Sequence, residues 1–211
     1  MNPTSAFLLV LLGFLPLHFA KRQNICKRVS VWTGIGCFIL GGLVMFGIAE
    51  GMTALVNLFH IALPAAKETV NSVSYSYDDL SYVLYLFVTS GFLAPVLEEC
   101  LCRWGVTSLL EFAEEKAKME ARAAYAINVV GTAALFGCLH LPFGNAVQAV
   151  YAGLSGLLLE ALYLGRAKSY VIGDQAQKNL TRDLLFHIGF NCTSTALTVM
   201  LGIASETIGK A

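Results

Sequence analysis

Three short polar patterns interrupt otherwise apolar stretches of the chain. The first, "EECLCR", sets two adjacent carboxylates one helical turn before a guanidinium; the second, "FGCLH", and the third, "HIGFN", carry imidazoles and a carboxamide. Residues four apart lie on one face of a helix, so each pattern can direct its polar groups toward a common interior. Together the patterns contain six candidate site residues: Glu98, Glu99, Arg103, His140, His187 and Asn191.

These residue types can together hydrolyse an amide. A carboxylate and a neutral imidazole can share a water molecule and deprotonate it. A second imidazole and a carboxamide can donate hydrogen bonds to a developing oxyanion. The remaining carboxylate can pair with the guanidinium, which reduces the cost of burying both charges. No covalent nucleophile is needed.

The composition indicates that a membrane positions these groups. Of the 211 residues, 56% are hydrophobic and 13% are charged, and that charged fraction is about half of the usual value for a soluble domain. The 14 basic residues match the 14 acidic ones, so nothing indicates a nucleic-acid partner. Apolar runs of about 20 residues predict transmembrane helices, and the bilayer is the expected surrounding.

The apolar runs predict an all-α polytopic membrane helix bundle of about six transmembrane helices around a buried polar site. We expect one integral-membrane domain over residues 1–211, multi-pass and located in the plasma membrane if the source is prokaryotic. A signal peptide is the alternative for the first run, and the second run is either one span with an embedded segment or two short spans. The runs cover roughly 5–20, 29–66, 81–110, 123–141, 145–165 and 184–204.

Basic residues predict the orientation of the spans. Eleven of the fourteen Lys and Arg residues fall in three polar breaks, 21–28, 106–122 and 166–183. Six spans place these breaks on one side, which the positive-inside rule makes cytoplasmic. Labelling or reporter fusions at the first and third breaks test this orientation, and labelling of both from outside would contradict it.

Two local features affect how the polar groups converge. Gly91 and Pro95 are expected to bend the third run just before the carboxylates. Depth counting at 1.5 Å per residue puts His187 near the start of its span and His140 near the end of its own. Convergence then requires bent helices or a turn at 142–145 that stays within the membrane.

The ordered set EExxxR, FxxxH and HxxxN resembles the CAAX protease and bacteriocin-processing family, also called the Abi family, which includes the Ras-converting CAAX endopeptidases. The resemblance covers roughly residues 82–200, and Cys102 stands where the family often has phenylalanine. It implies an intramembrane glutamate endopeptidase that cuts a membrane-anchored or lipidated protein substrate and needs no cofactor or metal. The sequence carries no signal for an oligomeric state.

The resemblance also implies a role for each candidate residue. Glu98 and His140 would activate the water, and His187 and Asn191 would form the oxyanion site. Glu99 and Arg103 would support the site or orient the substrate.

Several alternatives remain open at this level. The Glu98, Glu99 and Arg103 group could be a buried structural ion pair. A metal-dependent protease would use Glu98, His140, His187 and Asn191 as zinc ligands, although a carboxamide is a poor one. A membrane immunity or partner-binding protein would need no catalysis. Cysteine chemistry is a further option, but small fillers are the expectation for the motif-adjacent thiols, as a structural or interfacial role is for Glu160.

Overall fold

The computed structural model describes residues 18, 21, 24–58, 79–141 and 146–209. Within these ranges it contains helices and turns and no strand, which confirms the predicted all-α membrane bundle. Among the same residues, five helical stretches are long and apolar enough to cross a membrane, and the chain is an integral multi-pass membrane protein. The predicted first span, 5–20, lies outside the described residues. The separate helices are α2 (Val31–Leu58), α6 (Ala121–Leu139), α7 (Ala146–Leu164) and α8 (Leu180–Gly209).

A continuous helical run from Leu80 to Lys116, here called the long helix, passes through the molecule. Asp79 caps its start by accepting a 2.8 Å hydrogen bond from the backbone N–H of Ser81. The helix passes the end of the apolar run near Leu110 and continues into the charged segment that follows, which has the composition of a helix-former. Its parts are α3 (Leu80–Leu86), the π-helical η1 (Phe87–Leu93), α4 (Ala94–Glu99), the π-helical η2 (Cys100–Val106) and α5 (Thr107–Lys116).

The chain stays helical at Gly91 and Pro95, and η1 accommodates the proline. Pro95 has no N–H to give to the preceding turn, which frees carbonyls around Ser90 and Gly91. Asn191 of α8 donates a 2.9 Å hydrogen bond to the Ser90 carbonyl, and the Cys192 thiol lies 3.7 Å from the Gly91 carbonyl. A neighbouring helix thus satisfies the backbone, as a proline inside a membrane requires.

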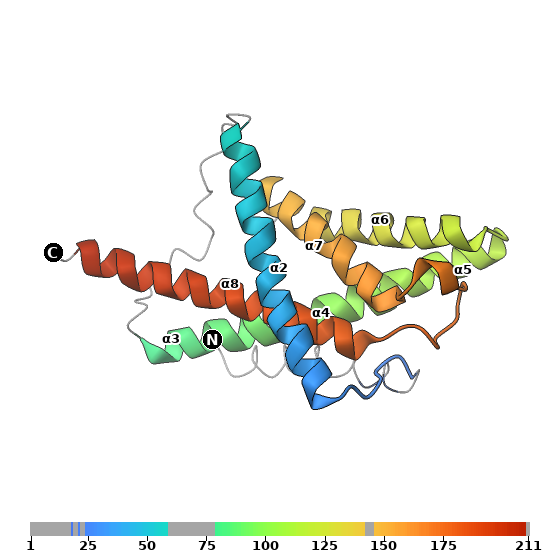
Figure 1. Ribbon diagram of the computed structural model, residues 1–211, viewed down its shortest axis with the longest axis horizontal. Coiled ribbons are helices and arrows are strands. Elements are labelled where there is room, and N and C mark those ends of the chain that lie inside the picture. The colour runs from blue at the N-terminus through green and yellow to red at the C-terminus, as the bar shows by residue number, and fades with distance from the viewer. Residues whose placement is uncertain (1–17, 19–20, 22–23, 59–78, 142–145, 210–211) are drawn as a thin grey trace.

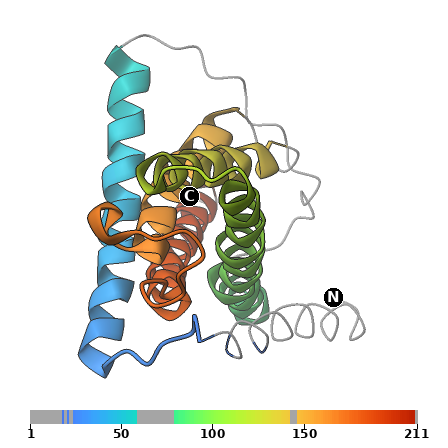
Figure 2. The ribbon, with the colours of Figure 1, turned by 90° about the vertical axis from the view of Figure 1, so that its right-hand side faces the viewer.

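Helix α2 crosses α8 with almost no space between the two backbones (Figure 1). A Cβ on Gly41 would meet the carbonyl of Phe186, and a Cβ on Gly189 would meet the carbonyl of Phe38. Small residues allow such close helix approach where no water drives association. Figure 2 shows α2 standing across α8 and the long helix, which are seen nearly end-on.

Helix α2 also settles part of the second apolar run. It continues through Glu50 and Gly51 without a break. The Glu50 side chain is exposed, so the helix does not have to bury its charge. The remainder of that run, 59–66, lies outside the described residues.

The three basic breaks meet at one end of the molecule. The Leu180 N–H donates to the Ile25 carbonyl at 2.9 Å, and Lys27 Nζ donates to the Ala176 carbonyl. Lys178 in turn pairs with Glu111 of α5. This proximity agrees with one shared side for the breaks, and their cytoplasmic location stays a prediction.

The expected depth mismatch between the two histidines is resolved by the length of the α5–α6 hairpin. From Glu98 to Lys116 the long helix rises about 27 Å, and α6 returns about 28 Å from Ala121 to His140. The α5–α6 hairpin therefore extends beyond the start of α8 and brings His140 back to the level of the glutamates (Figure 1). The turn at 142–145 lies outside the described residues.

Candidate active site

Four of the six candidate residues line one cavity of about 510 Å³, here called the chamber: Glu98, His140, His187 and Asn191. The long helix contributes Glu98, the end of α6 contributes His140, and one face of α8 contributes the other two. The two remaining candidates, Glu99 and Arg103, are 1% and 0% exposed and lie behind the chamber wall. Three separate helices thus supply groups of different chemistry to one space.

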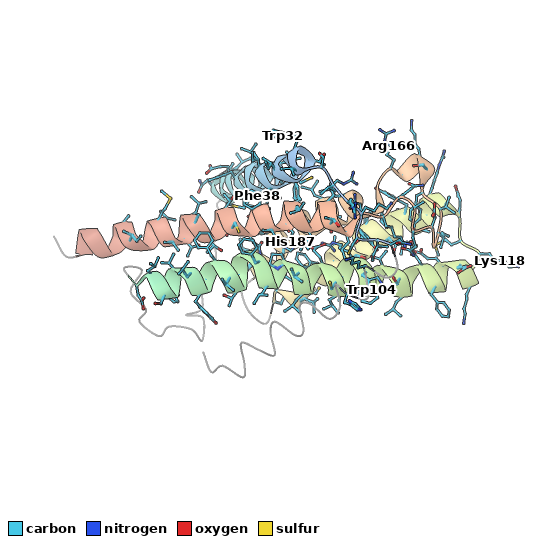
Figure 3. All side chains as sticks on the ribbon, turned by 90° about the horizontal axis from the view of Figure 1, so that it is seen from below. Trp32, Phe38, Trp104, Lys118, Arg166 and His187 are labelled. Carbon is cyan, nitrogen blue, oxygen red and sulfur yellow. The ribbon has the colours of Figure 1, made fainter. Side chains whose placement is uncertain are left out.

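His187 lies between α8 and the long helix (Figure 3) and contacts both glutamates. Its Nδ1 lies 2.6 Å from Glu99 Oε1, and its Nε2 lies 3.4 Å from Glu98 Oε2. Glu99 is paired with Arg103 and can only accept, so the hydrogen of Nδ1 is directed to Glu99. Nε2 is then the His187 atom that faces Glu98 and the chamber.

His140 is fixed in a similar way by its own helix. Its Nδ1 lies 2.8 Å from the Phe136 carbonyl, which can only accept, so Nδ1 carries the hydrogen. The Phe136 ring packs edge-on against both imidazoles, with centroid distances of 4.8 Å to His140 and 5.9 Å to His187. The Nε2 of His140 is left with its lone pair.

Arg103 is the centre of a buried charge cluster behind the chamber. Its Nε lies 3.1 Å from Glu99 Oε2, and its Nη1 lies 3.5 Å from Glu160 Oε2. Asp183 Oδ2 is 4.0 Å from Nε, and the guanidinium lies 5.1 Å from the centre of the Phe136 ring. The i,i+4 pairing of Glu99 with Arg103 follows from the spacing of the motif.

Two members of this cluster were not among the candidate residues. Glu160 has the structural role that was one expectation for it: it is fully buried and accepts a 2.8 Å hydrogen bond from Thr107. Asp183 was missed, although it precedes His187 by four residues, the same spacing that links His187 to Asn191. A search for polar residues at every fourth position of α8 would have found it.

A smaller cavity of about 220 Å³, here called the side pocket, lies on the other side of the same groups. Glu98, Phe136 and His140 line both cavities, and Cys102 lines only the side pocket. Three motif-adjacent thiols, Cys100, Cys102 and Cys192, are buried, while Cys138 is exposed. Such burial is typical of packing residues.

Among the described residues, no three His, Cys, Asp or Glu side chains gather in a way that could hold a metal ion. The carboxylate of Glu99 is already occupied by His187 and Arg103. The zinc alternative therefore has no ligand cluster to support it in this part of the chain.

Carboxylates and imidazoles around a chamber in a membrane helix bundle are groups of the kind that general acid–base chemistry uses. Residues 80–173 match the family described as type II CAAX prenyl endopeptidase Rce1-like. The match confirms the predicted resemblance to the CAAX protease and bacteriocin-processing family, and at family level it indicates a CAAX-type protease. No curated protein and no solved structure matches the chain.

The matched region contains the first two polar patterns but ends before the third. Glu98, Glu99, Arg103 and His140 lie within it, whereas His187 and Asn191 follow it. The fold brings the third pattern to the other two, because α8 lies against the long helix at the chamber.

Proposed function

We propose that the protein hydrolyses a peptide bond of a membrane-anchored or lipidated protein substrate within the bilayer. The observation that carries the proposal is the chamber, a single cavity lined by Glu98, His140, His187 and Asn191. Glu99 and Arg103 are buried behind its wall. An apolar protein surrounding would let a lipid-attached segment approach the chamber from the membrane.

Water activation is assigned to Glu98 and His140. The Glu98 side chain is 30% exposed, and the His140 Nε2 has a free lone pair, so a water between them can lose its proton to this pair. The resulting hydroxide attacks the scissile carbonyl, and the proton passes to the leaving amine.

The oxyanion site is assigned to His187 and Asn191. For His187 to donate, Nε2 must carry a proton, which it can share with Glu98 Oε2 until substrate binds. Asn191 gives one N–H to the Ser90 carbonyl and has a second N–H for the chamber. Glu99 and Arg103 hold His187 from behind the wall.

Cleavage of a farnesylated, internally quenched peptide by the purified protein tests the proposal. Glu98→Gln keeps the size of the side chain but cannot take a proton, so kcat/KM should fall on the order of 10²-fold or more. Glu50→Gln, at an exposed glutamate of α2, is the matched control and should cleave normally.

Three outcomes would contradict the assignment. If Glu99→Gln is inactive and well folded while Glu98→Gln cleaves normally, the two roles are reversed. If both variants and Arg103→Ala are active, the glutamate pair is structural and the protease proposal fails. Loss of activity with a chelator, restored by zinc, would favour the metal-dependent alternative.

The non-catalytic alternative is tested in the cell that makes the protein. An immunity or partner-binding protein would keep its biological effect after Glu98→Ala. An effect that disappears in this variant, at an unchanged protein level, supports hydrolysis.

A further inference from the structure

One guanidinium faces three carboxyl groups in the cluster behind the chamber. Glu99, Arg103, Glu160 and Asp183 are each between 0% and 1% exposed. If all three acids were ionised, the single positive charge of Arg103 would face three negative charges in a membrane interior. Burying each uncompensated ion there costs roughly several kcal/mol of free energy. At least one of the three carboxyl groups must therefore keep its proton.

The contacts of the first two acids suit an ionised carboxylate better than those of Asp183. Glu99 Oε1 receives the Nδ1 hydrogen of His187, and its Oε2 lies 3.1 Å from Arg103. Glu160 Oε1 receives the hydroxyl hydrogen of Thr107, and its Oε2 lies 3.5 Å from Arg103.

Asp183 has no comparable donor. Its distance to Arg103 Nε is 4.0 Å, too long for a hydrogen bond. Neither of its carboxyl oxygens finds a hydrogen-bond donor in the described part of the chain, and the same is true of Glu99 Oε2. Asp183 Oδ2 and Glu99 Oε2 nevertheless approach the same atom, Arg103 Nε, at 4.0 Å and 3.1 Å.

A single proton resolves this arrangement, because an ionised carboxylate only accepts hydrogen bonds whereas a protonated one also donates. We propose that Asp183 is a protonated positioning residue whose O–H donates to Glu99, and that Glu99 thereby holds the Nδ1–H of His187. With this proton in place, a chain of hydrogen bonds runs from Asp183 through Glu99 to the imidazole at the chamber.

This chain also fixes the register between two helices. Asp183 and His187 lie one turn apart on α8. His187 contacts the Glu99 carboxylate of the long helix, and the proposed O–H of Asp183 supplies a second contact from the same helix. Two contacts from one helix would restrain the Glu99 carboxylate against rotation, so that His187 presents Nε2 toward Glu98. The kinetic consequence rests on the proposed function, whereas the protonation of Asp183 does not.

Infrared spectroscopy tests the protonation directly. The chain has four aspartates, Asp78, Asp79, Asp174 and Asp183, and ordinary aspartates are ionised at neutral pH. Protein labelled with ¹³C at the aspartate side chain should show an isotope-shifted carbonyl band of a protonated acid at neutral pH. The band should vanish in Asp183→Asn and remain in Glu160→Gln; its absence from the unsubstituted protein overturns the proposal.

Substitution tests the positioning role. Asp183→Asn keeps a neutral donor of the same shape, so we expect kcat/KM within about threefold of the unsubstituted value. Asp183→Ala removes the donor and should lower kcat about tenfold or more with little change in KM. If Asp183 were instead an ionised partner of Arg103, Asp183→Asn would be as damaging as Asp183→Ala, and that result overturns the proposal.

The two levels of the proposal fail in different ways. A protonated-acid band together with normal cleavage by Glu98→Gln would refute the proposed catalytic role of Glu98 and leave the Asp183 assignment standing. An inactive Glu98→Gln variant without that band would refute the Asp183 assignment alone.

Discussion

Two buried polar clusters lie on the same long helix and differ in what surrounds them. The site cluster consists of Glu98, Glu99, Arg103, Glu160, Asp183 and His187 and borders the chamber. The loop cluster lies toward the end of that helix and connects it to α6 and to the 166–180 segment. Its members are Glu111, Glu114, Asn128, Tyr170 and Lys178.

The loop cluster is almost fully paired. Glu111 takes a hydrogen bond from Tyr170 at 2.9 Å and an ion pair from Lys178, and Asn128 donates to both oxygens of Glu114. Asn128 Oδ1 is its one buried side-chain atom without a partner in the described residues. None of its residues lines the chamber or the side pocket.

The site cluster is built differently. Several atoms of Arg103, Asp183, Glu99 and Glu160 have no well-directed hydrogen bond among the described residues, and Glu98 and His187 face open space. Polar groups that hold a loop are most stable when every donor and acceptor is paired. Under the proposed function, Glu98 and His187 instead keep hydrogen-bonding capacity for water and substrate. The comparison therefore separates a closed polar cluster from one that opens onto the chamber, and the following substitutions test it.

Arg103→Ala should have the largest effect, because it leaves several buried carboxyl groups without their cation. We expect a loss of about 3–5 kcal/mol in stability together with loss of cleavage. Thermal melting in detergent, measured beside Glu98→Gln, checks this, since Glu98→Gln should lose activity at a near-normal melting temperature. Arg166→Ala, at an exposed arginine, is the control. Normal melting of Arg103→Ala would show that the site cluster does not depend on its central charge.

Lys178→Met should show the opposite pattern in the loop cluster. The substitution keeps the apolar stem but leaves Glu111 with only the Tyr170 hydroxyl, so stability should fall by about 3 kcal/mol. The kcat/KM of the folded protein should stay near normal, because the loop cluster does not reach the chamber. Lys168→Met, at an exposed lysine, is the control. A drop in kcat at unchanged melting temperature would erase the distinction between the clusters.

Gly189→Ala tests the crossing that supports the site cluster from the α2 side. The added methyl group meets the Phe38 carbonyl, and such overpacking costs about 1–3 kcal/mol. Gly47→Ala on α2 is the matched control, since a Cβ there has nothing within 4 Å. Equal melting temperatures for the two variants would mean that the close crossing is not required.

Asn191→Ala should cost about 1 kcal/mol of stability through the lost bond to the Ser90 carbonyl, and cleavage through the lost oxyanion donor. Adding Pro95→Ala returns a backbone N–H to the freed carbonyls. The double variant should regain melting temperature but not activity. Recovery of activity would make Asn191 a structural residue alone.

Single replacement of Cys100, Cys102, Cys138 or Cys192 by Ala should have the smallest effect and leave substantial cleavage. Glu98 and His140 already supply a base in the proposed reaction, which gives the thiols no role, and three of the four are buried as packing residues are. Activity assays on the four variants, each with a melting curve, check this. A well-folded variant without activity would show that the replaced thiol takes part in the reaction.

Much of the site could be predicted from the sequence. Intramembrane Glu, His and Asn residues at four-residue spacing are rare and costly, so the three polar patterns identified Glu98, His140, His187 and Asn191 as residues that share a space. The length of the apolar runs likewise predicted a multi-pass helix bundle, because a bilayer allows few other architectures.

The apolar run and the helix end at different places. "EFAEEKAKMEAR" ends the apolar run by its charge, although its composition favours a helix. The fold continues the helix because Lys178 and Asn128 satisfy Glu111 and Glu114 from other elements. That extension is what lets His140 return to the level of Glu98.

The sequence by itself determined that carboxylate and imidazole groups lie inside a membrane helix bundle, because local spacing and the cost of buried charge are properties of each segment alone. Only the tertiary structure decided which carboxylate faces the chamber and which is paired behind it. Glu98 and Glu99 are adjacent in the chain, and their difference arises from Arg103 and from distant residues such as Asp183 and His187. Such partners meet only when α8 packs against the long helix, at a contact that sequence spacing does not encode.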